Sequence, residues 1–298
     1  MSLPDRTIGF GPDRIPVPAK VIEARVDWIT ATQSHDVEGT NLHDIGEHIL
    51  MELHAAGAYL REWHWRGYSG LTAGGSAVGA RDDGAIVRLS GDAAALAWRA
   101  LSVARCHITR LDLAVTIQLK YDLPKILANN YADLRELIDA GLYSRRVSYV
   151  SDSDGGDTLY VGRRTGEVFL RLYDKTRESG YAYPPASWRW EVELKRSKAQ
   201  QAWDDLLRSA DQESYVTAAV WDAYKTRGLT PCWDRGTAVV TRSVPAPVYD
   251  AERTYAWLMT TVAPAIDRLQ EWYDLAQLEA ACGFRRLKRA EERKYSTT

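Results

Sequence analysis

Three segments of the chain alternate apolar and polar residues with a period of two. They are ITRLDLAVTIQL at 108–119, EVFLRLYDK at 167–175 and WRWEVELK at 188–195. Successive side chains of a β-strand point to opposite faces, so each segment is predicted to present one apolar and one polar face. The pattern is typical of an antiparallel sheet with one buried side.

The flanking segments predict further strands and several helices. Residues 24–33 are rich in β-branched side chains and predict a strand, as do the shorter segments 85–90 and 158–161. Four glycines between residues 67 and 75 predict a hairpin. Apolar residues at helical spacing and capping signals predict helices over 41–62, 92–104 (with Asp92 as N-cap), 124–140, 197–210, 212–224 and 252–281. Together they predict an α+β fold: an antiparallel sheet with one helix-covered face and one polar active-site face, plus a mainly helical C-terminal part.

Changes in composition divide the chain into three parts. Residues 1–20 hold four of the eleven prolines and are predicted to form an irregular arm. Residues 21–225 hold the sheet and its helices. Residues 226–298 are predicted to be a helical C-terminal region that ends in a basic tail, Arg285–Lys294.

The composition excludes several classes of protein. A chain of 298 residues with 45% hydrophobic and 26% charged residues is an ordinary globular protein. Its apolar runs are too short for a membrane span, and its first residues do not form a secretory signal. Cys106, Cys232 and Cys282 form no metal or redox pair, which favours a reducing cytoplasm. With a net charge of −2, any nucleic-acid surface must be a local patch.

The polar face of the three strands gathers residues suited to phosphodiester chemistry. Carboxylates on a rigid face hold Mg²⁺ or Mn²⁺, arginines bind phosphate, and a tyrosine beside them is a candidate nucleophile. A solvated sheet face with cross-strand Arg–Glu pairs gives the same pattern, so the residues alone leave both interpretations open. The set comprises Asp112, Glu191, Glu193, Arg110, Arg171, Arg189, Lys175 and Tyr173.

The motifs in these strands resemble the replication initiation factor family. They are RLDLAVT at 110–116, TLYVGRRTGEVFLRLYDK at 158–175 and WRWEVELKRSKA at 188–199. The family comprises rolling-circle initiators of plasmids and filamentous phages and the related relaxases of integrative conjugative elements. The likeness extends more loosely over residues 24–225, including DWITAT at 27–32, and does not cover the last seventy residues.

This resemblance implies a site-specific DNA nicking-closing enzyme, related to HUH endonucleases but without their histidine pair. The nucleophilic tyrosine would form a 5′-phosphotyrosyl link and free a 3′-hydroxyl, and the same chemistry in reverse would rejoin strands. Mg²⁺ or Mn²⁺ is the implied cofactor. The implied roles are Tyr173 as nucleophile, Arg171, Lys175 and Arg189 on phosphate, Asp112, Glu191 and Glu193 on the metal, and Arg110, Arg163, Arg164 and Lys195 on DNA.

One residue departs from the family pattern. Thr116 stands where the first motif usually has a second aspartate, so Glu193 or water is the expected further ligand. The departure keeps two alternatives open: a DNA-binding regulator with reduced activity, and a metal-dependent hydrolytic nuclease. The expected partner is single-stranded or hairpin origin DNA. A host helicase or polymerase and a second copy of the chain are further candidate partners, and no membrane is expected.

Two tyrosines of the second motif compete for the role of nucleophile. Tyr173 has Arg171 and Lys175 as neighbours of like parity, a cationic setting expected to lower the pKa of its phenol. Tyr160 stands between Thr158 and Gly162, which offer no such charge. The sequence therefore favours Tyr173.

Overall fold

The computed structural model describes residues 8–9, 19–37, 41–119, 131–132, 134–136, 138–141, 144–152 and 156–236. The chain divides into two compact units, Met1–Val244 and Pro245–Thr298, and every described residue belongs to the first. The predicted helix over 252–281, the basic tail and Cys282 lie outside the described residues.

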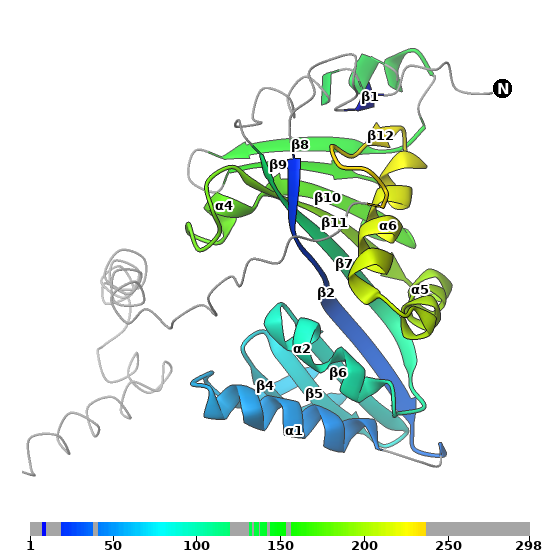
Figure 1. Ribbon diagram of the computed structural model, residues 1–298. Helices are drawn as coiled ribbons and strands as arrows, with labels where there is room; N and C mark the ends of the chain where they lie inside the picture. The colour runs from blue at the N-terminus through cyan, green and yellow to red at the C-terminus, as the bar shows by residue number, and fades with distance from the viewer. Residues whose placement is uncertain are drawn as a thin grey trace, which may run out of the picture. The chain divides into compact units, whose positions relative to one another are not determined.

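A ten-stranded antiparallel sheet organises the described part of the chain (Figure 1). The three patterned segments become neighbouring strands, in the order β7, β11, β10, which confirms the prediction that they share one sheet. In spatial order the strands are β3 (Arg61–Trp65), β4 (Tyr68–Ala73), β5 (Ser76–Arg81), β6 (Gly84–Ser90), β2 (Ala19–Ser34), β7 (His107–Leu119), β11 (Ser187–Lys195), β10 (Val168–Asp174), β9 (Gly156–Val161) and β8 (Val147–Asp152). The two-residue strands β1 (Ile8–Gly9) and β12 (Leu229–Thr230) pair in parallel.

Among the helices whose bounds lie in the described part of the chain, four cover the apolar face of this sheet. They are α1 (Leu42–Ala55), α2 (Asp92–Leu101), α5 (Ser197–Arg208) and α6 (Gln212–Lys225); the short α4 is Lys175–Glu178. A Cβ added at Gly46 of α1 would come within 2.5 Å of Val87 in β6, so only glycine allows this close approach. Tyr224 of α6 packs edge-on against Trp190 of β11, with 4.7 Å between the ring centroids. The apolar positions of β7 beneath the helices are fully buried, and the predicted α+β fold with one helix-covered face is confirmed.

Two predictions about helix ends are wrong, each for a local reason. The helix expected over 41–62 ends at Ala55, and Gly57 then takes a φ of 101° that side chains disfavour. The edge strand β3 follows it. Asp92 is not an N-cap: Gly91 holds that position, and the Asp92 carboxylate pairs with Arg25 of β2 at 2.8 Å. Of the helix expected over 124–140, residues 124–130, 133 and 137 lie outside the described part.

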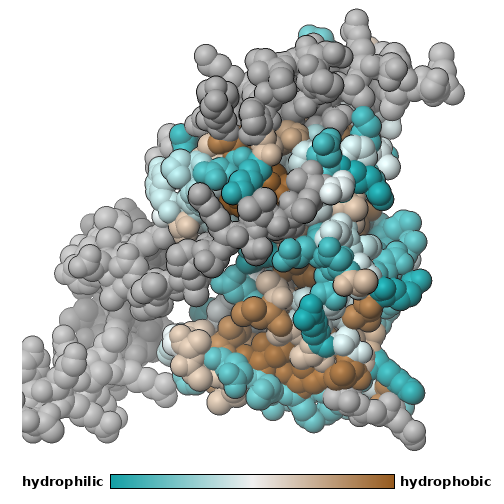
Figure 2. Space-filling model, viewed as in Figure 1, coloured by the Kyte–Doolittle hydropathy of each residue, from teal (hydrophilic) through white to brown (hydrophobic). Residues whose placement is uncertain are grey.

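The outer surface of α1 and α2 is partly apolar. Figure 2 shows hydrophobic residues gathered over these two helices in the lower part of the view. Met51 of α1 is 50% exposed and Leu96 of α2 is 82% exposed. No helix in the described ranges is both long and apolar enough to span a membrane.

Candidate active site

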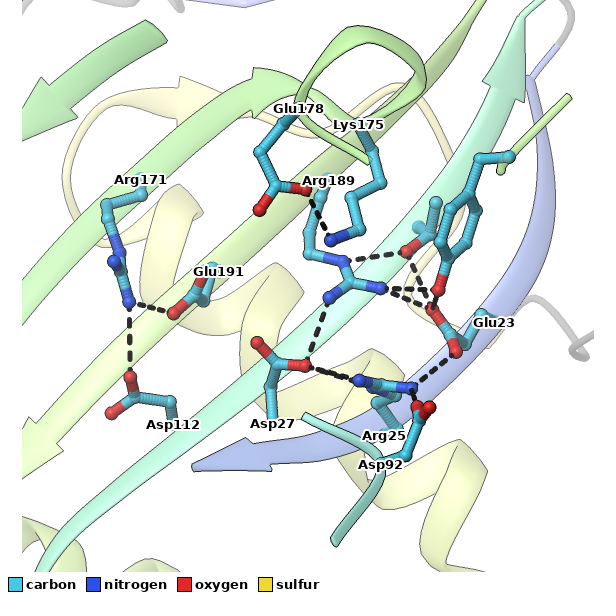
Figure 3. Close-up of polar contacts among 12 residues, drawn as sticks. Glu23, Arg25, Asp27, Asp92, Asp112, Arg171, Lys175, Glu178, Arg189 and Glu191 are labelled. Carbon is cyan, nitrogen blue, oxygen red and sulfur yellow. Dashed lines mark hydrogen bonds and ion pairs between the residues drawn. The ribbon is translucent and has the colours of Figure 1, made fainter. Parts of the chain in front are cut away.

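The face of the sheet away from the helices brings the predicted site residues together. Asp112 of β7 lies opposite Glu193 of β11, and Glu191 lies opposite Arg171 of β10. One step along the same strands, Tyr173 lies opposite Arg189, which in turn lies opposite Thr116. Figure 3 shows four of these side chains, Asp112, Arg171, Arg189 and Glu191, in front of the strands, with helices behind. Strand parity therefore placed all of them on one face, as predicted.

Three carboxylates converge on one guanidinium in what we call the carboxylate cluster: Asp112, Glu191, Glu193, Arg171 and Arg110. Nη2 of Arg171 contacts Oδ2 of Asp112 at 3.2 Å, an oxygen of Glu191, and Oε2 of Glu193 at 4.0 Å. Arg110 binds Asp112 through two hydrogen bonds of 2.9 and 2.6 Å and lies 3.0 Å from Glu193. The cluster is thus a closed network of ion pairs.

The carboxylates of the cluster are buried, which argues against the alternative interpretation of a solvated sheet face. Asp112 is 1% exposed, Glu191 2% and Glu193 5%. The side chains of the face cover one another: the Arg110 guanidinium lies 4.5 Å from the centre of the Trp28 ring while it holds Asp112. A sequence alternation shows which side chains share a face, but not how long arginine and tryptophan side chains fold over it.

Burial sets the protonation of these acids. It raises the pKa of Glu191 to about 8, with repulsion from Asp112 and Asp27 added and attraction to Arg171 opposing. Burial also raises the pKa of Asp112, against the attraction of Arg110 and Arg171. Burial, rather than mutual repulsion, is thus the main reason that the charged forms of these acids are disfavoured, and a further bound cation favours the charged forms.

The donor set fits a hard divalent ion. Three carboxylates from two neighbouring strands are the oxygen ligands that Mg²⁺ and Mn²⁺ prefer. Within the described residues, no three acidic, histidine or cysteine side chains are arranged as a ready-made metal site, because the carboxylates close on Arg171. A metal therefore requires the guanidinium of Arg171 to move aside.

Arg171 also keeps one donor without a partner. Its Nε is buried and donates to no acceptor in the described part of the chain. A buried guanidinium with a free N–H beside carboxylates is suited to a phosphate oxygen. This observation supports the predicted role of Arg171.

Arg189 organises a second group on the same face, which we call the Arg189 cluster: Arg189, Glu23, Asp27, Arg25, Thr116 and Tyr183. Its guanidinium reaches Glu23 at 2.6 Å and Asp27 at 3.0 Å, and donates to Thr116 Oγ1 at 3.0 Å and to the Tyr183 hydroxyl at 2.9 Å. The side chain is 1% exposed. Arg189 is thus committed to partners within the protein, and its predicted contact with phosphate stays a prediction.

Glu23 and Asp27 were missed by the sequence analysis. Both come from β2, which begins at Ala19 rather than at the predicted residue 24. Thr116 donates a hydrogen bond of 3.0 Å to Glu23, so a carboxylate from another strand lies beside the position of the missing aspartate. The alternation of Glu23, Arg25 and Asp27 was the available signal, but irregularities in the β2–β7 register after Val21 and Val26 obscure it.

Tyr173 lies between the two clusters, and its pKa departs from the expectation. Burial raises the pKa of Tyr173 well above its usual range; Glu191 and Asp27 raise it further and Arg189 lowers it. The expected lowering by Lys175 and Arg171 is wrong, because burial of the phenol outweighs the effect of the nearby cations. Lys175 pairs with Glu178 at 2.6 Å, and its Nζ lies 5.8 Å from the centre of the Tyr173 ring.

Tyr160 lies beside a cationic cavity that the sequence did not predict. Its ring stacks on Phe169 with 5.7 Å between centroids, and both rings line a cavity of about 890 Å³. None of the described lining residues is acidic. We call this cavity the arginine pocket; its cations are Arg135, Arg145, Arg146, Arg163 and Arg164. Two predicted DNA contacts, Arg163 and Arg164, thus belong to a local basic patch.

The other two predicted DNA contacts are bound within the protein. Arg110 holds Asp112, and Lys195 lies 2.5 Å from Glu193 and also contacts the Arg164 carbonyl oxygen. Either residue would have to exchange its partner to reach a phosphate.

The Arg189 cluster predicts that the folded protein loses stability at acidic pH. Arg189 and Arg25 lower the pKa of Asp27 to about 2, against the effect of its burial. Because this pKa lies below the unfolded value of 3.8, the stabilisation is complete above about pH 4 and is lost as the pH falls towards 2. We expect Asp27 to contribute about 2 kcal/mol to this loss.

Urea unfolding of wild type and Asp27→Asn between pH 2 and 6 measures that contribution. The variant should be less stable at pH 6 and show a shallower decline below pH 4. Parallel curves for the two proteins would contradict the assignment.

Comparisons with known proteins bear on the family. The replication initiation factor family matches residues 106–279, more than half of the chain. A solved rolling circle replication initiator protein from Geobacillus stearothermophilus shares 21% sequence identity with a TM-score of 0.49, covering 70% of this chain and 86% of that one. Comparison with curated proteins finds no match. The matched region contains β7, β10 and β11, the strands that carry the carboxylate cluster and Tyr173, and the chain belongs to the replication initiation factor family.

Proposed function

We propose that this protein is a rolling-circle replication initiator that nicks and rejoins one strand of origin DNA by tyrosine transesterification. One observation carries the proposal. Tyr173 and the carboxylate cluster lie on the same face of the sheet, the face away from the helices, which we call the open face; on it Tyr173 lies opposite Arg189. Family membership supports DNA as the partner.

Tyr173 is the proposed nucleophile. Its Oη attacks the scissile phosphorus, the bond from phosphorus to the 3′-oxygen breaks, and the phenol proton ends on that oxygen. The raised pKa keeps Tyr173 protonated until DNA binds. Since one phosphodiester replaces another, a 3′-hydroxyl can reverse the step and reseal the strand.

The buried cations supply the remaining functions. The free Nε of Arg171 is placed to donate to a phosphate oxygen. Asp112, Glu191 and Glu193 would hold Mg²⁺ or Mn²⁺, which supplies charge stabilisation and orientation of the phosphate. The carboxylate arrangement supports this assignment but also requires Arg171 to change partners.

The arginine pocket is the proposed entry for the DNA backbone. Arg145 and Arg146 precede β8, Arg163 and Arg164 follow β9, and Arg135 lies in the helical residues 134–136. Tyr160 on the pocket wall lies directly opposite Arg171 on β10. This position makes Tyr160 the second candidate nucleophile. Although the chain has a net charge of −2, the arginines of the pocket create a local positive potential that attracts the DNA backbone.

Covalent capture tests the proposal without knowledge of the origin. Wild-type protein is incubated with Mn²⁺ and a labelled pool of hairpins with random loops, and the products are separated on a denaturing gel. We expect a labelled band that migrates with the protein, together with fragments ending in 3′-hydroxyl groups. Cleavage with no labelled band would indicate the hydrolytic nuclease, and binding without cleavage would indicate the regulator.

Loss of the metal-binding carboxylates should abolish this reaction. With EDTA, or with Asp112→Asn, we expect nicking to fall by more than the roughly 10–100-fold that loss of an outer-shell partner costs. The matched control is Asp82→Asn, an exposed carboxylate in the turn between β5 and β6. Equal nicking by Asp112→Asn and wild type, with thermal melting unchanged, would show that the metal is held elsewhere.

A further inference from the structure

A group of aromatic and cationic side chains lies on the open face at the end of the sheet remote from Tyr160. Trp28 of β2, Trp63 and Trp65 of β3, and Arg88 of β6 form what we call the tryptophan platform. The rings of Trp63 and Trp65 stack with 6.1 Å between centroids and 22° between planes. The Arg88 guanidinium lies 5.1 Å from the Trp28 ring centre, 5.6 Å from Trp65 and 5.8 Å from Trp63.

Strand register places the platform on the same face as the carboxylate cluster. Arg88 lies opposite Thr30 on β2, and Thr30 opposite Arg110 on β7. Trp63 lies opposite Gly70, and Gly70 opposite Gly79. A Cβ at Gly79 would come within 3.0 Å of the Trp63 ring, so glycine at this position leaves room for the indole.

Arg88 differs from the other arginines of this face. Arg25, Arg110, Arg171 and Arg189 are each held by carboxylates. Among the described residues, Arg88 has neither an ion pair nor a side-chain hydrogen bond, and its guanidinium lies over three indole rings. Burial lowers its pKa, and repulsion from Arg110 lowers it further. A half-buried cation with no counter-ion is placed to receive an anion.

The platform continues into the carboxylate cluster through Arg110. One face of the Arg110 guanidinium lies 4.5 Å from the Trp28 ring centre, while its edge binds Asp112. Trp65, at the outer end, is 36% exposed. A ligand on the platform therefore extends directly towards the proposed site of cleavage.

We propose that the tryptophan platform binds unpaired bases of the DNA strand by stacking, with Arg88 contacting the phosphate between them. Indole faces beside an arginine bind single strands without regard to sequence, because every base has a π-face. A duplex keeps its bases stacked on one another and does not offer those faces. This inference rests on the proposed function, since it adds a subsite for the same DNA strand.

Equilibrium DNA-binding measurements test the tryptophan platform independently of strand nicking. Three labelled ligands of about a dozen nucleotides are used in EDTA: an oligothymidylate, a strand of abasic sugar phosphates, and a duplex. We expect Trp63→Ala and Trp65→Ala each to weaken oligothymidylate binding about 5–100-fold and to leave abasic binding unchanged. Trp65→Phe should restore most of the affinity.

A matched pair tests the cation. Arg88→Gln should weaken binding and reduce the salt dependence of log Kd by about 0.7. The control is Arg99→Gln, whose guanidinium lies 5.3 Å from the Trp98 ring centre on a helix, away from the open face.

Several outcomes would overturn the inference. Wild-type affinity of Trp65→Ala for oligothymidylate would do so, as would equal losses on the abasic strand or preference for the duplex. Because every binding assay omits metal, failure of the platform is distinct from failure of the proposed function. Covalent capture could succeed even if the platform variants bind DNA like wild type. Conversely, the platform could bind DNA even if the protein never nicks it.

Discussion

Tyr173→Phe is expected to remove both nicking and the covalent adduct. The substitution deletes one oxygen, and Tyr173 Oη is the atom that the proposed reaction joins to phosphorus. Phenylalanine retains the ring, and the ion pairs of both clusters do not involve the phenol. We therefore expect wild-type thermal stability and DNA affinity with no labelled protein band on a denaturing gel.

Tyr160→Phe is the matched control. This tyrosine lies on the neighbouring strand and lines the arginine pocket. The variant should keep the adduct, with at most weaker binding. An adduct that survives Tyr173→Phe and vanishes with Tyr160→Phe would transfer the nucleophilic role to Tyr160, and persistence in both variants would exclude both residues.

Arg189→Met is expected to destabilise the fold by about 3–5 kcal/mol. The guanidinium is 1% exposed and holds Glu23, Asp27, Thr116 and Tyr183. Methionine fills much of the same volume but leaves Glu23 and Asp27 with only one of the cluster's two arginines, Arg25. Urea unfolding at pH 7 measures the loss.

Two comparisons test this explanation. Arg208→Met removes an exposed pair with Asp205 at 3.0 Å and should cost less than about 1 kcal/mol. Adding Glu23→Gln and Asp27→Asn to Arg189→Met should recover part of the lost stability, because the two buried negative charges are then removed as well. A loss below about 1 kcal/mol for Arg189→Met alone would mean that the cluster contributes little.

Strand alternation was sufficient to predict half of the open face. The alternation in β7, β10 and β11 runs without a break, so parity alone places Asp112, Arg171 and Glu191 together and Trp190 in the core. A period of two is a local property, and it is preserved wherever the register is regular.

The other half could not be predicted, for physical reasons that differ between residues. Asp27 and Trp28 are adjacent in sequence yet both contact side chains of the open face, because the β2–β7 register shifts between Val26 and Trp28. Trp63 and Trp65 belong to a five-residue edge strand, which is too short to show a period. The raised pKa of Tyr173 follows from burial, which depends on side chains that arrive from other strands.

The closed ion pairs of the carboxylate cluster have a consequence for charge. When all are ionised, Asp112, Glu191 and Glu193 are matched in formal charge by Arg110, Arg171 and Lys195. A divalent ion and one phosphodiester brought to this neutral group would leave a single positive charge. A phenolate cancels that charge, so arrival of both ligands favours ionisation of a tyrosine that burial otherwise keeps neutral. Reactivity would then depend on assembly of the whole site, and the protein alone would carry an inert phenol.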